Sequence, residues 1–194
     1  MAKKSIDLYV RTAPEWVATI LNNFDEFLAD HANCERKASA LAMSLVVKYP
    51  DRTGIIPRLI ELAQEELEHF RQVYELMLSR GVAAIPDTRD PYVNKLLALR
   101  RHGRDEGFLD QLLLASIIEC RGAERFRLIS EALQDTHLKH FYRDLWTAEA
   151  KHGHVFVDMA LECFDEKTVY DRLHEIARAE AEILGSLEWR PSLH

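Results

Sequence analysis

The sequence has few cysteines, no long apolar run and no excess of positive charge. Its three cysteines, Cys34, Cys120 and Cys163, are far apart and form no Cys-x-x-Cys motif. This spacing excludes a rubredoxin-like iron site within the chain and fits reduced thiols in the cytoplasm. No run of 18 apolar residues occurs, and the first residues lack the apolar region of a signal peptide. We therefore expect a cytoplasmic protein that has no membrane partner.

The charge balance is acidic, with 25 Lys and Arg against 32 Asp and Glu and a net charge of −7. Such a balance gives no support to a surface that coats nucleic acid generally, so any contact of this kind must use a local basic patch. We expect no DNA partner. A solvated charged face is the preferred interpretation of the basic residues, and a phosphate-binding patch is the alternative. The residues concerned are Arg100, Arg101, His102, Arg104, Arg121, Arg125, Arg127, Lys139, His140 and Arg143.

Length and periodicity predict one all-α domain. A chain of 194 residues with 47% hydrophobic and 29% charged residues is typical of a soluble globule. We expect a single domain over 1–194, with a core bundle at about 13–164, an additional C-terminal helix at about 166–187, and loose segments at 1–12 and from residue 189. No β-strand is needed. The predicted helices are 14–49, 55–80, 92–101, 106–133, 136–164 and 166–187.

Two Glu-x-x-His motifs, Glu66 with His69 and Glu149 with His152, stand out in this pattern. Three residues along a helix place both side chains of each motif on one face. Each motif is preceded at nearly the same distance by a single glutamate, Glu35 or Glu119, so the two halves of the chain repeat. Two helices that give one Glu and two that give Glu-x-x-His are the ligand set of a carboxylate-bridged di-iron or di-manganese four-helix bundle.

The candidate ligands occupy the stripe of each helix that Leu or Val should fill. Ionised glutamate is almost never buried without a partner, and the alternative of four surface glutamates places all four on the wrong face at once. Converging carboxylates repel one another, and two divalent cations remove that conflict. The pattern therefore predicts a ferritin-like four-helix bundle in which residues 82–104 form the long crossover.

Carboxylate oxygens with one imidazole per metal suit Fe²⁺ or Mn²⁺ better than structural zinc. We predict two iron ions, with manganese as the alternative, and O₂ as co-substrate at the open coordination positions. Glu66 and Glu149 are assigned as bridges, one histidine ligates each metal, and the remaining two glutamates are terminal ligands. No catalytic residue is predicted beyond the ligands. The predicted ligands are Glu35, Glu66, His69, Glu119, Glu149 and His152.

Two residues near these ligands in the sequence each have two possible roles. His31 lies one turn before Glu35 and is either a satisfied buried histidine, which we prefer, or a residue that supports or joins the metal ligands. Gly122 lies one turn after Glu119 and provides either close helix packing or space for a substrate. Tyr142 is expected in the core and His154 at the surface.

The sequence around the ligands resembles the tRNA 2-methylthio-isopentenyladenosine hydroxylases (MiaE-like), a ferritin-like non-haem di-iron family. The similarity covers about residues 12–163, and its most specific part is the Asp-His-Ala-Asn-Cys-Glu block at 30–35. The sequence departs from the family pattern at Gly122-Ala123, at Lys151 and in the length of its C-terminal region. The other matching segments are 65–70, 118–121, 124–126, 141–142 and 149–152.

The resemblance implies an O₂-dependent monooxygenase that hydroxylates the isopentenyl group of a modified adenosine in tRNA. It also implies an external electron donor, and it places the family's metal ligands on the six residues already selected by spacing. The alternatives are a ferritin-like protein that oxidises or stores iron, a di-metal peroxidase on the same ligand frame, and a metal-containing bundle without turnover.

Overall fold

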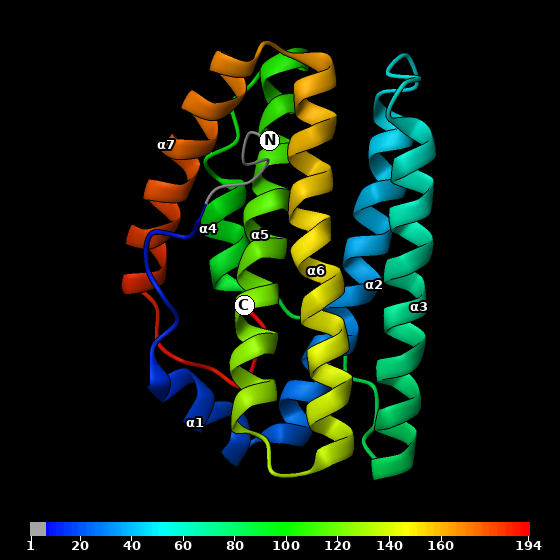
Figure 1. Cartoon of the computed structure of the whole chain (residues 1–194), viewed down its shortest axis with the longest axis vertical. Coiled ribbons are helices and arrows are strands. Elements are labelled where there is room, and N and C mark those ends of the chain that lie inside the picture. The colour runs from blue at the N-terminus through cyan, green and yellow to red at the C-terminus, as the bar shows by residue number, and fades with distance from the viewer. Residues whose placement is uncertain (1–6) are drawn as a thin grey trace. The chain divides into compact units, whose positions relative to one another are not determined.

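The computed structural model describes residues 7–194, and within this range the chain forms seven helices and no strand (Figure 1). The expected loose leader at 1–12 lies in part outside the described residues. Among the described helices, none combines the length and the apolar character that crossing a lipid bilayer requires. The helices are α1 (Pro14–Asn22), α2 (Phe24–Lys48), α3 (Ile56–Arg80), α4 (Pro91–Leu97), α5 (Arg104–Ala132), α6 (Thr136–Cys163) and α7 (Glu166–Gly185).

The chain divides into two compact units. The first unit contains Glu15–Thr88 and Arg190–Leu193, and therefore helices α1 to α3. The second contains Arg89–Trp189, the described residues up to Pro14, and His194, and therefore helices α4 to α7. The single domain expected over 1–194 stays a prediction.

The main feature of the first unit is the antiparallel pair α2 and α3 (Figure 1). Helix α3 has a proline in its first turn and ends at Gly81, whose φ of 70° is the left-handed conformation that glycine adopts without strain. Ser39 of α2 donates a hydrogen bond of 2.7 Å to the backbone carbonyl of Ala63 in α3. Because Ser39 and Ala63 each lie about one turn from a predicted ligand, this bond fixes the relative register of Glu35 and Glu66.

The prediction of one continuous helix from residue 14 to 49 is wrong. The helix breaks at Asn23, whose φ of −136° and ψ of 42° are not helical. The Asn23 side chain donates to the carbonyl of Thr19, which illustrates how asparagine competes with the helical backbone for hydrogen bonds. The break redirects α1, so Trp16 packs edge-on against Phe27 with 6.4 Å between ring centroids.

The expectation of a loose tail from residue 189 is also wrong. The indole N–H of Trp16 donates to the carbonyl of Ser192 at 3.2 Å, and the backbone N–H of Leu193 donates to Oδ2 of Asp30 at 2.8 Å. The Leu193 residue is buried, with 3% of its surface exposed. These contacts join residues more than 160 positions apart, so no local sequence pattern signals them.

In the second unit, α5 and α6 form a second antiparallel pair, and α7 packs beside α5 (Figure 1). An aspartate caps the start of α4, α6 and α7, and each accepts a hydrogen bond from the backbone N–H three residues later. Such a bond satisfies one of the donors that every helix start leaves open. The capping residues are Asp90, Asp135 and Asp165.

A buried ion network holds α7 and the N-terminal segment to α5. Arg121 and Glu180 have no exposed surface, and their charged groups approach to 2.7 Å. Arg121 also donates to the carbonyl of Val10, while Glu124 accepts hydrogen bonds from the backbone and hydroxyl of Thr12. Burial opposes the charge of Arg121, but Glu180 and its neighbours outweigh it and raise the pKa of the guanidinium. The expected loose leader is therefore bound at residues 10–12.

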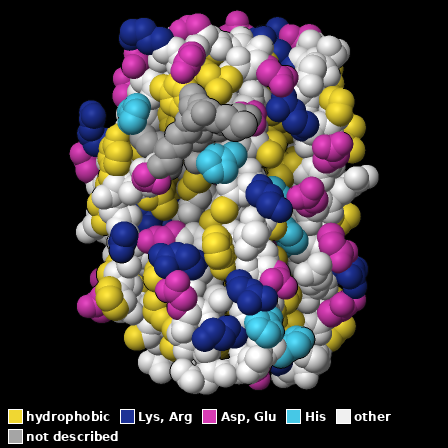
Figure 2. Space-filling model, viewed as in Figure 1, with side chains coloured by type: hydrophobic (Ala, Val, Ile, Leu, Met, Phe, Trp, Pro, Cys, Tyr) yellow, Lys and Arg dark blue, Asp and Glu magenta, His cyan; other side chains and the backbone are white. Residues whose placement is uncertain are grey.

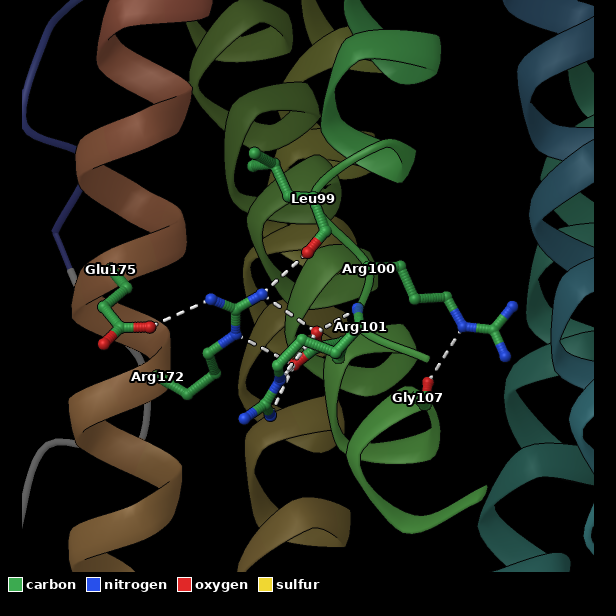
Figure 3. Close-up of polar contacts among 7 residues, drawn as sticks. Leu99, Arg100, Arg101, Gly107, Arg172 and Glu175 are labelled. Carbon is green, nitrogen blue, oxygen red and sulfur yellow. Dashed lines mark hydrogen bonds and ion pairs between the residues drawn. The ribbon is translucent and has the colours of Figure 1, made fainter. Parts of the chain in front are cut away.

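A second ion cluster fixes the end of the crossover against α5 and α7 (Figure 3). Asp110, with no exposed surface, accepts hydrogen bonds from the side chains of Arg101 and Arg172 and from the backbone N–H of Arg101. Arg172 also donates to the carbonyl of Leu99 at 2.8 Å. The predicted basic run at 100–104 is thus partly neutralised by a buried carboxylate.

Candidate metal centre

The first unit contributes three of the predicted ligands. Glu35 lies on α2, and Glu66 and His69 lie one turn apart on α3. All three are buried, with 3%, 1% and 9% of their surfaces exposed. One ligand atom from each lies within 4.8 Å of the other two. Nδ1 of His69 is 3.4 Å from Oε2 of Glu66 and 3.7 Å from Oε2 of Glu35, so these atoms converge on one place.

His31 extends this set by one hydrogen bond. It has no exposed surface, its ring stacks on Phe27, and its Nε2 lies 2.6 Å from Oε1 of Glu35. Glu35 therefore presents one carboxylate oxygen to His31 and the other toward His69. His31 is absent from the groups whose ligand atoms lie within 4.8 Å of one another. The preferred interpretation of His31, a buried histidine with a satisfied hydrogen bond, agrees with this geometry.

The second unit contributes the other three predicted ligands. Glu119 lies on α5, and Glu149 and His152 lie one turn apart on α6. Glu149 and His152 are each 2% exposed, and Glu119 is half-buried. One ligand atom from each again lies within 4.8 Å of the other two, and Nδ1 of His152 is 3.1 Å from Oε2 of Glu149. The two sets therefore have the same composition, two carboxylates and one imidazole.

A close approach of α5 and α6 positions the second set. A Cβ atom added at Gly153 would lie 2.6 Å from Sγ of Cys120, which is shorter than any real contact. Ser116 donates to the carbonyl of Gly153 at 2.8 Å across the same crossing. Cys120 and Gly153 directly follow Glu119 and His152, so this crossing sets the distance between the helices that carry the ligands. The sequence pattern indicated a positioning role for neither Cys120 nor Gly153.

The structure also shows the surroundings of the other residues that the sequence singled out. Tyr142 is fully buried and packs on Phe126, so the core interpretation is confirmed. His154 is half-buried, so it lies partly at the surface, and its Nδ1 is buried without a hydrogen-bond partner among the described residues. A Cβ at Gly122 would meet, among the described residues beyond its own helix turn, His194 at 3.7 Å. This is an ordinary van der Waals distance, so a methyl group would fit at this position. All three cysteines are thiols in the described structure.

The chemistry of each set fits a divalent transition metal. Carboxylate and imidazole donors suit Fe²⁺ and Mn²⁺, whereas structural zinc sites prefer thiolate-rich tetrahedra. Buried carboxylates without a compensating cation would be driven to protonate, and a bound cation removes this penalty. Each set is therefore a possible metal-binding group, and the structure adds the positions of its donors to what spacing predicted.

Comparison with known families identifies the group to which the chain belongs. Residues 2–194 match the model of the family described as tRNA-(MS[2]IO[6]A)-hydroxylase (MiaE). The chain belongs to the MiaE family. The match spans nearly the whole sequence, so it includes both ligand sets and α7 as well as the region that carried the resemblance.

Two relatives carry the name tRNA 2-(methylsulfanyl)-N(6)-isopentenyladenosine(37) hydroxylase. The chain is 33% identical over 183 residues to the protein of Pseudomonas putida, and the match covers 94% of this chain and 89% of the relative. It is 25% identical over 228 residues to the protein of Salmonella typhimurium, covering 92% of this chain and 84% of that relative. Two bacterial proteins of this name are thus similar to the chain along most of its length.

A solved structure supports the fold. "Protein 43 with aldehyde deformylating oxygenase activity from Synechococcus" superposes with a TM-score of 0.91 at 34% sequence identity, covering 96% of this chain and 94% of that one. The prediction of an all-α, ferritin-like four-helix fold with a long crossover and an additional C-terminal helix is confirmed. The six predicted ligands stay a prediction at this point, because no comparison assigns residues.

Proposed function

We propose that this MiaE-family protein is an O₂-dependent monooxygenase that hydroxylates the isopentenyl group of 2-methylthio-isopentenyladenosine in tRNA. Family membership and the names of the two bacterial relatives support this reaction. The observation within the chain that carries it is the pair of sets, each of two carboxylates and one imidazole, in which every residue except the half-buried Glu119 is buried. This repeated composition is the donor set of carboxylate-bridged di-iron proteins.

The proposed metal ligands are the six predicted residues, which would hold two iron ions. Manganese fits the same donors. Four carboxylates carry four negative charges, which two divalent cations balance in a buried environment. His31 holds Oε1 of Glu35 by a hydrogen bond, and Oε2 lies toward Nδ1 of His69, where it would be available to a metal ion.

Bound iron would supply the redox chemistry by which one atom of O₂ enters an allylic C–H bond and the other leaves as water. This balance needs two electrons and two protons, so the reaction requires an external electron donor. The chain's own residues hold the metal-binding oxygens and nitrogens in place and keep water from them by burial. We further propose that the protein acts in the cytoplasm on tRNA.

A second candidate function comes from the solved structure. The Synechococcus protein is described as having aldehyde deformylating oxygenase activity, and its identity to this chain is as high as that of the Pseudomonas relative. An aldehyde-processing oxygenase would use the same kind of metal site with a small apolar substrate. The family match over residues 2–194 favours tRNA as the substrate.

The test is a parallel assay of both substrates. Iron-loaded, reduced protein is given O₂ and either tRNA carrying the methylthio-isopentenyl modification or a long-chain aldehyde, and products are read by mass spectrometry. We expect the modified nucleoside to gain one oxygen atom and the aldehyde to remain intact. Glu119→Ala should abolish the gain, whereas Glu131→Ala, an exposed glutamate on the same helix, should keep it. Loss of the formyl carbon from the aldehyde with unchanged tRNA would select the second candidate.

A further inference from the structure

Helix α6 has a second patterned face, opposite the one that carries the metal ligands. Glu149 and His152 lie on the buried face, and the residues on the far side are exposed and largely basic. The helical repeat places these residues within about a third of the helix circumference. We define them as the basic stripe, and they are Lys139, His140, Arg143 and Lys151. Figure 2 shows Lys, Arg and His side chains along the part of the surface where α6 runs in Figure 1.

Two of the three Lys and Arg side chains of the basic stripe have no carboxylate partner among the described residues. Elsewhere on the surface many cations have an acidic partner, as in the pairs of Lys37 with Asp87 and of Arg80 with Asp25. Lys139 and Lys151 contact no carboxylate in the described part of the chain, whereas Arg143 forms an exposed ion pair with the adjacent Asp144 at 3.6 Å. The stripe is therefore a local region of positive potential on a protein whose net charge is −7.

An aromatic side chain links the basic stripe to the buried face. Trp146 is half-buried, lies one turn after Arg143 and one turn before Glu149, and stacks on no other ring in the described structure. Going around the helix, Trp146 stands between the stripe and the ligand face. A partly exposed indole beside cations is the combination with which proteins hold single-stranded RNA, because bases stack on the ring while cations bind phosphates.

We propose that the outer face of α6 docks the single-stranded loop of the tRNA substrate. The basic stripe binds backbone phosphates, and Trp146 stacks a base at the edge that leads to Glu149. This inference rests on the proposed function and specifies where its substrate binds. A loop fits this surface better than an RNA duplex does, since the deep, narrow major groove of a duplex excludes side chains and its bases are already stacked.

Charge-matched variants of the full-length, iron-loaded protein test the role of the basic stripe. The first carries Lys139→Ala, Arg143→Ala and Lys151→Ala. The control carries Lys48→Ala, Arg89→Ala and Arg178→Ala, three exposed cations outside α6 that contact no carboxylate in the described structure. The two variants have the same net charge, so general electrostatic attraction changes equally in both. Binding of fluorescently labelled modified tRNA is measured over a series of salt concentrations.

We expect the stripe variant to bind tRNA about tenfold more weakly or worse, and its plot of log affinity against log salt to be shallower by about 2. That change follows from the loss of three phosphate contacts on a single strand, at about 0.7 per contact. The control should stay within about twofold of the parent protein in affinity and keep its salt dependence. Equal weakening of both variants would overturn the stripe as a docking site.

Trp146 is tested by Trp146→Ala and Trp146→Phe. Loss of stacking should weaken tRNA binding about fivefold or more in the alanine variant, while phenylalanine keeps most of the affinity. Iron content should equal that of the parent in both, which separates docking from damage to the metal site. Equal loss in the two variants would show that Trp146 acts by packing and not by stacking.

The outcomes separate this inference from the proposed function. If the parent protein hydroxylates tRNA and the stripe variant binds tRNA as tightly as the parent, the docking site is elsewhere and the function stands. If the parent protein neither binds nor hydroxylates modified tRNA, both are overturned. Hydroxylation by the parent with a raised KM and an unchanged kcat in the stripe variant supports both.

Discussion

At the scale of single residues, the carboxylate of Glu35 in the candidate metal centre has a histidine near each of its two oxygens. Its Oε1 is held at 2.6 Å by His31, and its Oε2 lies 3.7 Å from Nδ1 of His69. Hydrogen bonds of this kind orient a metal-binding carboxylate before the metal arrives, and their loss commonly lowers metal affinity.

We therefore expect His31→Ala to lower the affinity for Fe²⁺ by about tenfold to a hundredfold, measured by competition with a chelator. His31→Gln should recover part of this affinity, because its amide N–H can replace the imidazole donor. His137→Ala, at an exposed histidine, should bind iron like the parent. Unchanged affinity in the alanine variant would show that the hydrogen bond does not orient Glu35.

The candidate ligands could be selected from sequence because they are polar residues at helix positions where the pattern calls for apolar ones. A glutamate on an apolar stripe is conspicuous, and two Glu-x-x-His motifs repeat with their preceding glutamates. The hydrogen bond of His31 could be anticipated only as one of several possibilities, since a four-residue spacing places two side chains side by side without fixing which atoms meet. Which carboxylate oxygen His31 takes depends on rotamers, which the pattern does not specify.

At the scale of elements, α5 and α6 cross so closely at Cys120 and Gly153 that no side chain fits at residue 153 without a shift of its neighbours. Gly153→Ala would bring a Cβ to 2.6 Å from Sγ of Cys120, directly beside His152 and Glu119. We expect this change to lower the free energy of unfolding by about 1–3 kcal/mol, as overpacking does, and to reduce iron binding. Urea denaturation and iron content are the measurements.

The matched control for this prediction is the double variant Cys120→Ala with Gly153→Ala. It removes the sulfur atom that the new methyl group would meet, while the next neighbour, the carbonyl oxygen of Ser116, remains at an ordinary 3.4 Å. Stability and iron content should therefore return most of the way to the parent values. Additive losses in the double variant would indicate that the crossing tolerates the methyl group and that the damage arises elsewhere.

Helix ends were predicted well where a proline or glycine marks them. The placement of segments was predicted poorly where it depends on contacts with residues far away in the sequence. The start of α1 at Pro14 and the end of α3 at Gly81 follow from proline and glycine chemistry, and the stripes give the long helices. The break at Asn23 has neither proline nor glycine. The binding of Thr12 to Glu124 and of Leu193 to Asp30 joins segments more than 100 residues apart. Periodicity contains no information on such pairs.

At the scale of the whole molecule, the buried carboxylate of Asp110 links stability to pH. Burial raises the pKa of this carboxyl, but hydrogen bonds from Arg172 and Arg101 outweigh burial and hold the pKa below its usual value of 3.8. A folded-state pKa below the unfolded value means that the ionised form stabilises the fold. This stabilisation is fully present above pH of about 4 and is lost as the pH falls through the folded-state pKa.

We expect Asp110→Asn to lower the free energy of unfolding by about 3 kcal/mol at neutral pH, because two arginines lose their shared anion in a buried position. Its stability should also decline less than that of the parent as the pH falls below about 4. Asp87→Asn, which alters an exposed pair with Lys37, should cost less than about 1 kcal/mol. Parallel acid-unfolding curves for the parent and Asp110→Asn would contradict the prediction.

Trp16 gives the protein a built-in optical reporter of its C-terminal segment. The chain has three tryptophans, and Trp16 is 1% exposed, with its indole N–H bound to the carbonyl of Ser192, whereas Trp146 and Trp189 are half-buried. An indole in apolar surroundings emits at shorter wavelength than one in water. Emission from Trp16 should therefore shift to longer wavelength when the segment that contains Ser192 detaches from Trp16, before the helices unfold. Undocking of the segment could then be followed in real time by intrinsic fluorescence, without an attached dye.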